Sequence, residues 1–351
     1  MAGLAAAIEL RAGGLGVVVA EARGAPGERF GETVPPGTLA ALGRLGLGEA
    51  FRADGHVSCP GGISRWGDDR IGHNDAILDP LGPAWHVDRA RLESMLRARA
   101  VAAGVGLWAP VRAVRVTRAG ERWRVGLRAG SGGVGSARAR WVLDATGGSA
   151  WFARRQGARR AQVDRMVALI RLADLAGGTF TAQTVVESSP AGWWYGARLP
   201  GGRLVTALVT DPDSAGEFRR AGRARWHAEL ERTCLLAPRL AGCTVHAAGF
   251  RVRSVTVSRL DQVAAEHWLA VGDAAAELDP IGGRGIHDAL VGAADAAWTV
   301  AAAYGLRDPP PWRYPERVRA RFADHLLTRS ALYQRERRWP DSPFWRRRAA
   351  G

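Results

Sequence analysis

The chain has 351 residues, of which 47% are hydrophobic and 24% charged, so it is long enough to bury two hydrophobic cores. Its net charge is +15, but every basic residue is an arginine and the arginines are spread along the sequence, which argues against a nucleic-acid partner. No apolar run reaches the roughly 20 residues of a membrane span, and the three cysteines fit no metal or disulfide framework. We therefore expect a cytoplasmic protein that uses no membrane and no metal.

Residues 3–14 predict a helix of small apolar side chains, and residues 15–23 predict a buried strand. Helix, glycine stop, strand and then Glu21 match the second half of a βαβ unit that binds a dinucleotide. There Gly3 is the last of three glycines, and Glu21 accepts hydrogen bonds from the ribose hydroxyls of an adenosine. Taken alone, Glu21 could equally be an acidic residue at the end of a strand that binds no ligand. Because the first strand and first two glycines do not precede Gly3, we expect a truncated unit whose start is encoded upstream.

Further helices are predicted over residues 37–51 and 87–105, the second with Asp88 as its N-cap. After them, alternating residues predict a three-stranded meander whose last strand ends at a glycine pair. Its strands are expected at residues 112–120, 122–130 and 139–148.

From residue 166 to 257 the pattern changes to longer alternating strands, interrupted by one helix at about 214–233. This is typical of an antiparallel sheet with a covering helix. Residues 267–304 return to the pattern of the N-terminal segment, with a buried strand, a glycine-rich loop and a long helix of small residues. The fold class is therefore α/β, with an inserted sheet and a helical C-terminus.

The glycine-rich loop carries the strongest signal for a ligand. A buried strand reaches Gly272 and Asp273, and a loop with Pro280 and three glycines then opens a helix. Glycines permit close backbone approach, and a helix N-terminus favours negative charge, so such a loop suits the pyrimidine edge of a flavin. The loop glycines are Gly282, Gly283 and Gly285.

These motifs resemble the FAD-dependent monooxygenase superfamily with the p-hydroxybenzoate-hydroxylase fold, in its tryptophan-halogenase-like branch. Within it, the chain is most similar to flavoproteins that modify a tryptophan of a partner protein during quinone cofactor maturation. The resemblance covers almost the full length and rests on segments such as "GLAAAIEL", "GETVPPGTLAALGRLGL", "AWHVDRARLESML", "VLDATGG", "AGWWYGARLPGGRLVTALVTD" and "VGDAAAELDPIGGRGI".

The resemblance implies a Rossmann-like FAD-binding domain interrupted by a substrate domain that is built on a mixed or antiparallel sheet. It implies that Arg89 contacts FAD, that Gly147 lies in a backbone turn beside the adenine and pyrophosphate, and that Asp273 with the glycine loop holds the flavin. Arg89 is also compatible with a surface ion pair at a helix start. The expected domains are residues 1–50, 86–150 and 258–305 for FAD, 51–85 and 151–257 for the substrate, and 306–351 for a helical tail.

Halogenases of this superfamily depend on a lysine between flavin and substrate. Here that place falls near Ser58, and the sequence contains no lysine. The resemblance therefore favours oxygen chemistry over halogenation, on an electron-rich indole or phenol in a small molecule, peptide or protein. Electrons would come from NAD(P)H directly or through a separate flavin reductase. A catalytically impaired flavoprotein, suggested by the truncated N-terminus, is the alternative.

Candidate substrate-facing residues lie on one predicted strand of the sheet. Alternation places Trp193 and Tyr195 on one face and Trp194 on the other, so Trp193 and Tyr195 could form an aromatic wall or pack a core. His287, next to Asp288 after the glycine loop, is a further candidate for proton transfer. None of these three candidates, Trp193, Tyr195 and His287, is assigned a catalytic step.

Overall fold

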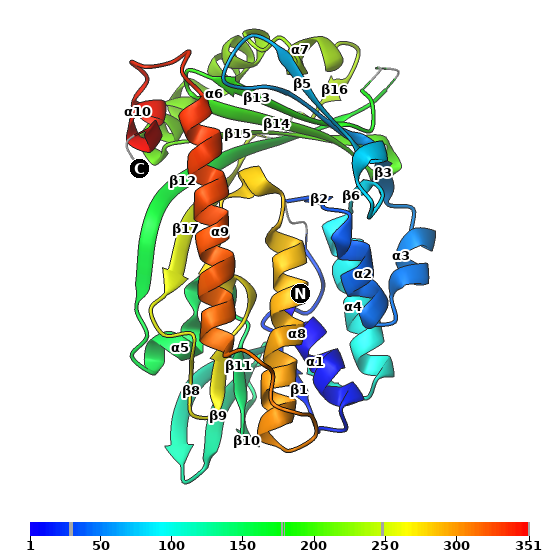
Figure 1. Ribbon diagram of the computed structural model, residues 1–351, viewed down its shortest axis with the longest axis vertical. Helices are drawn as coiled ribbons and strands as arrows, with labels where there is room; N and C mark the ends of the chain where they lie inside the picture. The colour runs from blue at the N-terminus through cyan, green and yellow to red at the C-terminus, as the bar shows by residue number, and fades with distance from the viewer. Residues whose placement is uncertain (28–30, 177, 179, 247–248, 350–351) are drawn as a thin grey trace.

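The computed structural model describes residues 1–27, 31–176, 178, 180–246 and 249–349. A large sheet crosses the upper part, with the nucleotide-fold helices below it and one long helix, α9 (Tyr314–Arg335), running along both (Figure 1). The expected α/β class, with a mixed, mainly antiparallel inserted sheet and a helical C-terminus, is confirmed. In the described part of the chain, no helix is both long and apolar enough to cross a membrane.

The lower part contains short parallel strands in two separate pieces. Strand β1 (Val18–Ala20) pairs with β7 (Gly106–Trp108), and β11 (Val142–Asp144) pairs with β19 (Trp268–Ala270), which also meets β18 (Ala264–Ala265). Three helices lie beside them, and the first packs against the other two. They are α1 (Ala2–Ala12), α4 (Arg89–Ala102) and α8 (Gly285–Ala303).

Small residues allow the start of α1 to lie close to the segments that follow β11 and β19. A side chain at Gly3 would place its Cβ 2.8 Å from the Cβ of Ala145, and one at Gly272 would place it 2.8 Å from Ala2. Helix α4 begins as expected, because the Asp88 side chain accepts hydrogen bonds from the backbone N–H groups of Ala90 and Arg91. The small residues are therefore required for close packing, in addition to the cofactor binding that the sequence predicts for them.

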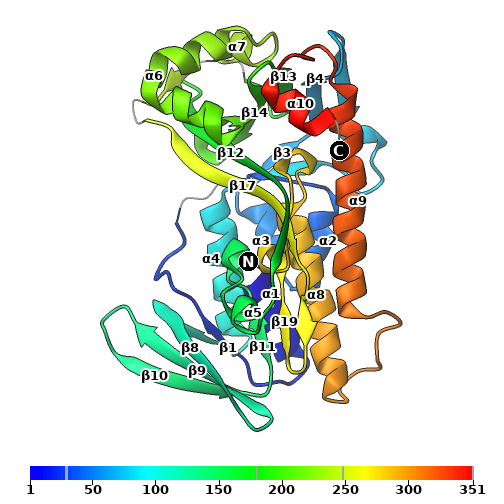
Figure 2. The ribbon, with the colours of Figure 1, turned by 90° about the vertical axis from the view of Figure 1, so that its left-hand side faces the viewer.

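The predicted meander is correct in its first two strands and wrong in its third. Strands β8 (Val111–Ala119) and β9 (Arg122–Ala129) are joined by β10 (Val134–Ala139), whereas residues 142–144 form β11 of the parallel sheet. The cause is the change from the mostly exposed side chains of β10 to Val142, Leu143 and buried Asp144, which suit a covered parallel strand. Figure 2 shows the meander projecting from the lower end, on the side away from α9.

The upper sheet has nine strands and is antiparallel except where β13 meets β4. Its order is β20 (Ala276–Glu277), β17 (Arg251–Leu260), β12 (Arg160–Asp174), β15 (Arg203–Thr210), β14 (Gly192–Leu199), β13 (Thr184–Ser189), β4 (Gly61–Arg65) and β5 (Ile71–Asp75), with β16 (Thr244–Val245) beside β12. The expected domain boundary at residue 258 thus falls inside β17, and the boundaries stay a prediction.

The two faces of this sheet are covered by different helices. The outer face packs on α6 (Pro212–Glu231) and α7 (Leu236–Arg239), where Trp194 meets Trp226 with ring centroids 4.6 Å apart. The inner face packs on α9 and α10 (Pro343–Ala349). Between the two parts lies a small sheet with α2 (Gly37–Arg44) and α3 (Gly48–Ala53) beside it. Its strands are β2 (Thr33–Val34), β6 (Ala84–His86) and β3 (Val57–Cys59).

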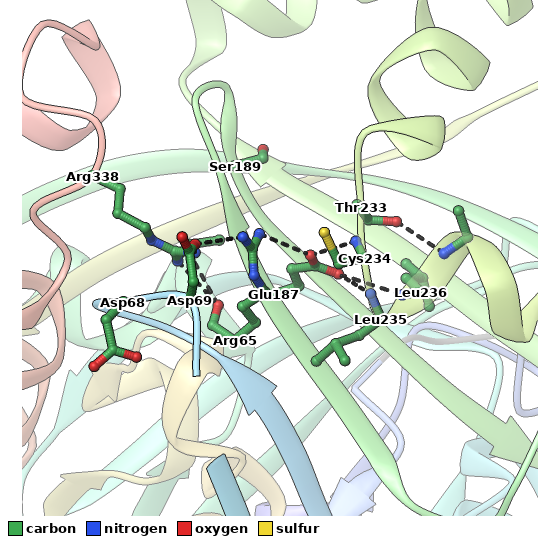
Figure 3. A network of polar contacts seen from close by, with 12 residues as sticks. Arg65, Asp68, Asp69, Glu187, Ser189, Thr233, Cys234, Leu235, Leu236 and Arg338 are labelled. Atoms are coloured by element: carbon green, nitrogen blue, oxygen red, sulfur yellow. Dashed lines mark hydrogen bonds and ion pairs between the residues drawn. The ribbon is translucent and has the colours of Figure 1, made fainter. Parts of the chain in front are cut away.

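Buried Glu187 ties the outer helices to the sheet (Figure 3). Its two carboxylate oxygens accept hydrogen bonds from the backbone N–H groups of Cys234, Leu235 and Leu236, at the start of α7. Arg65 approaches the same carboxylate at 3.6 Å and also pairs with exposed Asp69. The carboxylate therefore caps a helix and neutralises an arginine at once.

Candidate functional site

The predicted nucleotide-binding residues follow the carboxyl ends of parallel strands. Glu21 comes directly after β1, Gly147 lies in the turn after β11, and Asp273 comes after β19. In open α/β sheets this edge is where nucleotides bind. Gly3 lies against Ala145, so the structure brings the start of α1 to the turn after β11, whereas Glu21 follows β1 in a separate piece of sheet.

The turn after β11 is built around the buried Asp144 carboxylate. It accepts hydrogen bonds from the Thr146 N–H and hydroxyl and from the N–H groups of Phe152 and Ala153. Gly147 has a φ of +69°, which favours glycine, and a Cβ on Gly148 would lie 2.1 Å from Glu277 Oε1. Asp144 therefore shapes the turn predicted to lie beside the cofactor.

The loop of residues 279–285, here called the flavin loop, has backbone open to a ligand. Pro280–Gly282 form a single turn, Asp279 accepts a hydrogen bond from the Ile281 N–H, and Gly283 has a φ of +60°. A Cβ at Gly283 or Gly285 would meet no atom within 4 Å. The open backbone and the N-terminus of the 19-residue α8 fit the electron-rich edge of a flavin.

A segment of residues 31–38, here called the strap, joins the flavin loop region to the upper sheet. The Thr33 hydroxyl lies 2.7 Å from the Tyr195 hydroxyl, and Thr38 Oγ1 lies 3.5 Å from His287 Nδ1. Arg89 donates a hydrogen bond to the Gly31 carbonyl at 3.0 Å, so it braces the strap. Burial lowers the pKa of His287, which favours its neutral form beside the strap.

The three aromatic residues of β14 separate as alternation predicts. Trp194 faces the outer helices, while Trp193 and Tyr195 face inward. Trp193 is packed against Trp66, and its indole N–H donates to the Tyr333 hydroxyl at 3.0 Å, so its described contacts are those of a core residue. Burial, with Glu32 nearby, raises the pKa of Tyr195 well above its ordinary value, so its hydroxyl stays protonated.

His86 is a candidate that the sequence did not single out, although it lies in the "HVDR" segment. It is fully buried on β6, and its Nε2 lies 2.8 Å from the Thr184 hydroxyl. Cys59 Sγ lies 3.6 Å from the same hydroxyl, whereas Ser58, at the place of the halogenase lysine, is exposed. His86 therefore joins the small sheet to β13, close to Tyr195 on the neighbouring strand.

We expect stability to fall as the pH drops through the range in which His86 titrates. Burial lowers the pKa of His86 to about 4. In the unfolded chain His86 binds a proton below about pH 6.5, whereas in the folded chain it binds one only below about pH 4. The free energy of unfolding should therefore decrease by about 3 kcal/mol across that range through this group alone. Urea unfolding of wild type and His86→Gln at several pH values measures it.

Exposed His73 offers the control for this pH dependence. His73→Gln should keep the wild-type slope of stability against pH, whereas His86→Gln should flatten it. Equal slopes in wild type and His86→Gln would show that His86 does not contribute.

Comparison with known proteins identifies the family. The model of the FAD-binding domain family matches residues 1–310, which is most of the chain. The chain belongs to this family. The match confirms the expected superfamily of FAD-dependent oxidoreductases and monooxygenases, which are enzymes, and FAD as the cofactor.

Two comparisons add relatives of named activity. The chain is 26% identical over 293 residues to the putative FAD-dependent oxidoreductase LodB of Marinomonas mediterranea, covering 83% of this chain and 78% of LodB. It is 27% identical, with a TM-score of 0.71, to QhpG, a peptidyl tryptophan dihydroxylase essential for tryptophylquinone cofactor biogenesis. That likeness covers 99% of this chain and 76% of QhpG.

The halogenase likeness is one of fold. CmlS, a flavin-dependent halogenase, superposes with a TM-score of 0.88 at 24% identity and covers 99% of this chain. This chain in turn spans 65% of CmlS, about two thirds of its length.

Proposed function

We propose that this enzyme hydroxylates an electron-rich aromatic ring with reduced FAD and O₂, and that the ring is a tryptophan within a partner polypeptide. The observation that carries the proposal is the likeness to the peptidyl tryptophan dihydroxylase QhpG over nearly the whole chain. The likeness to LodB supports the same oxidoreductase class.

The chemistry divides between cofactor and protein. When bound and reduced, FAD supplies O₂ activation, so that one oxygen atom enters the ring and the other leaves as water. Glu21, Gly3 and the turn at Gly147 would hold the adenosine and phosphates, and Asp273 with the flavin loop would hold the ring system. The close approach of Gly3 to the turn after β11, and the positions of Glu21 and Asp273 after parallel strands, support that assignment.

The protein's own part is to place the substrate and exclude water. Tyr195, held by Thr33 of the strap, presents a protonated hydroxyl on the inner face of the sheet. His287, kept neutral by burial, lies where the strap meets α8 and can accept a proton. Helices α9 and α10 cover the rest of that face, which keeps the site dry.

Halogenation is the weaker proposal for this chain. The halogenase relative CmlS shares the fold at 24% identity, but the sequence offers no lysine to hold a hypohalous acid. A serine hydroxyl or a buried thiol, as at Ser58 and Cys59, does not supply that cationic group.

The test is FAD uptake followed by turnover. The purified protein should bind FAD and, with NADH, NADPH or a separate flavin reductase as donor, add 16 or 32 mass units to a tryptophan peptide. Candidate polypeptides encoded beside this gene are the substrates to try, with free tryptophan and a simple phenol as comparisons.

Each outcome decides a part of the proposal. Failure to bind FAD would overturn it, and bound FAD without turnover under any donor would favour an impaired flavoprotein. Hydroxylation of the small aromatics with no reaction of any polypeptide would contradict the peptide substrate. Chloride or bromide incorporation would show that the halogenase alternative is right.

A further inference from the structure

The carboxylate of Asp279 attaches the flavin loop to α9. Asp279 is buried, and its Oδ1 accepts the hydrogen bond from the Ile281 N–H at 3.0 Å. Its Oδ2 accepts hydrogen bonds from Arg329 Nε at 2.9 Å and from the Tyr333 hydroxyl at 3.1 Å. Both donors belong to α9, so one side chain joins the loop backbone to the helix.

A second attachment holds the backbone of the same residue. The Asp279 N–H donates to His325 Nε2 at 2.9 Å, which requires that this nitrogen carry no proton. Burial lowers the pKa of His325 and so favours this neutral form. The ring also lies alongside the loop, because a Cβ at Gly282 would be 3.9 Å from His325 Nδ1.

Helix α9 reaches the upper sheet through two of these same residues. The Trp193 indole N–H donates to the Tyr333 hydroxyl at 3.0 Å, so that hydroxyl accepts from β14 and donates to the flavin loop. Arg329 also pairs with Asp164 on β12. The loop and the strands that face it are therefore joined through α9.

We propose that His325, Arg329 and Tyr333 are positioning residues for the flavin loop, which fix its N–H groups toward the cofactor and couple the loop to the substrate-facing sheet. Backbone donors stabilise a developing charge only when their direction is set beforehand, and Gly282 and Gly283 leave this loop free to adopt other conformations without such contacts. This inference rests on the proposed function for its role in turnover, but the loop's rigidity can be measured without FAD.

The experiment measures hydrogen exchange of the backbone amides of residues 281–285 in the FAD-free chain, and FAD affinity by fluorescence titration. Tyr333→Phe removes one hydroxyl and keeps the ring. His325→Leu removes the acceptor, while His325→Gln offers a side-chain oxygen in its place. We expect about tenfold faster exchange in the loop and about tenfold weaker FAD binding for Tyr333→Phe and His325→Leu.

Two variants separate positioning from packing. His325→Gln should keep most of the wild-type loop protection and FAD affinity, whereas a packing role would make His325→Leu the better tolerated change. Thr210→Val removes a different buried hydroxyl, whose bond goes to the Ala191 carbonyl, and should leave loop exchange unchanged.

The outcomes are separable from those of the proposed function. Wild-type loop protection in both Tyr333→Phe and His325→Leu would overturn the inference, even if the enzyme hydroxylates tryptophan. Fast loop exchange in these variants, together with a wild-type chain that binds no FAD, would support the positioning role of these residues and overturn the proposed function instead. Urea unfolding of each variant confirms that the protein is folded.

Discussion

Replacing Asp144 with alanine is expected to lower the free energy of unfolding by about 3–5 kcal/mol. Its carboxylate is 1% exposed and accepts hydrogen bonds from three backbone N–H groups and the Thr146 hydroxyl. Alanine would leave these donors buried without an acceptor, including two at the start of the helix α5 (Trp151–Arg155). Urea unfolding with far-UV circular dichroism measures the change.

Two further variants serve as comparisons for the expected loss of stability in Asp144→Ala. Asp144→Asn keeps one acceptor oxygen and should lose less stability than the alanine variant. Asp261 is exposed and also accepts from two backbone N–H groups, those of Arg159 and Gln262. Asp261→Ala should cost less than about 1 kcal/mol, because water replaces the lost acceptor. Equal losses at the two sites would contradict the role given to burial.

Replacing Glu187 with alanine is expected to destabilise the chain by a similar amount, about 3–5 kcal/mol. Glu187 is 1% exposed, and three backbone N–H groups at the start of α7 and the guanidinium of Arg65 point at its carboxylate (Figure 3). Removing it leaves a cationic group and three donors without their buried partner. Thermal and urea unfolding of the variant give the measurement.

Asp69 supplies the matched control, because it pairs with the same arginine from the surface. Its side chain is 77% exposed, so solvent screens the pair, and Asp69→Asn should change the free energy of unfolding by only about 0–0.5 kcal/mol. If Asp69→Asn were as damaging as Glu187→Ala, the arginine pair and not the helix cap would carry the stability.

The nucleotide-fold elements were predictable because their signals are local. A small-residue helix, a strand ending in Glu21, the Asp88 cap and the glycine loop each occupy one short segment. The side chains of β14 were also predictable in orientation, since successive residues of a strand must point to opposite faces. The third meander strand was misplaced because the two apolar residues before Asp144 are compatible both with a meander strand and with a parallel strand. Their pairing with β19 is a tertiary contact that the local sequence does not specify.

The roles within the site could not be read in this way. Thr33 and Tyr195 are 162 residues apart, and Trp193 and Tyr333 are 140 apart. No local pattern specifies such pairs, so the aromatic wall and the packed core remained equal interpretations of Trp193 until its contacts with Trp66 and Tyr333 were known. His86, His325 and Arg329 were missed for the same reason.

By itself, then, the sequence determined the family and the cofactor and predicted the segments that would approach it, because these depend on glycine positions, strand ends and helix starts that lie close together in the chain. The tertiary structure alone decided which side chains meet, which carboxylates are buried and how the flavin loop is held. Those properties arise when segments distant in the sequence, such as the strap, β14 and α9, come together in the fold. Burial then sets the protonation state of the titratable side chains and how much each buried group contributes to the free energy of unfolding.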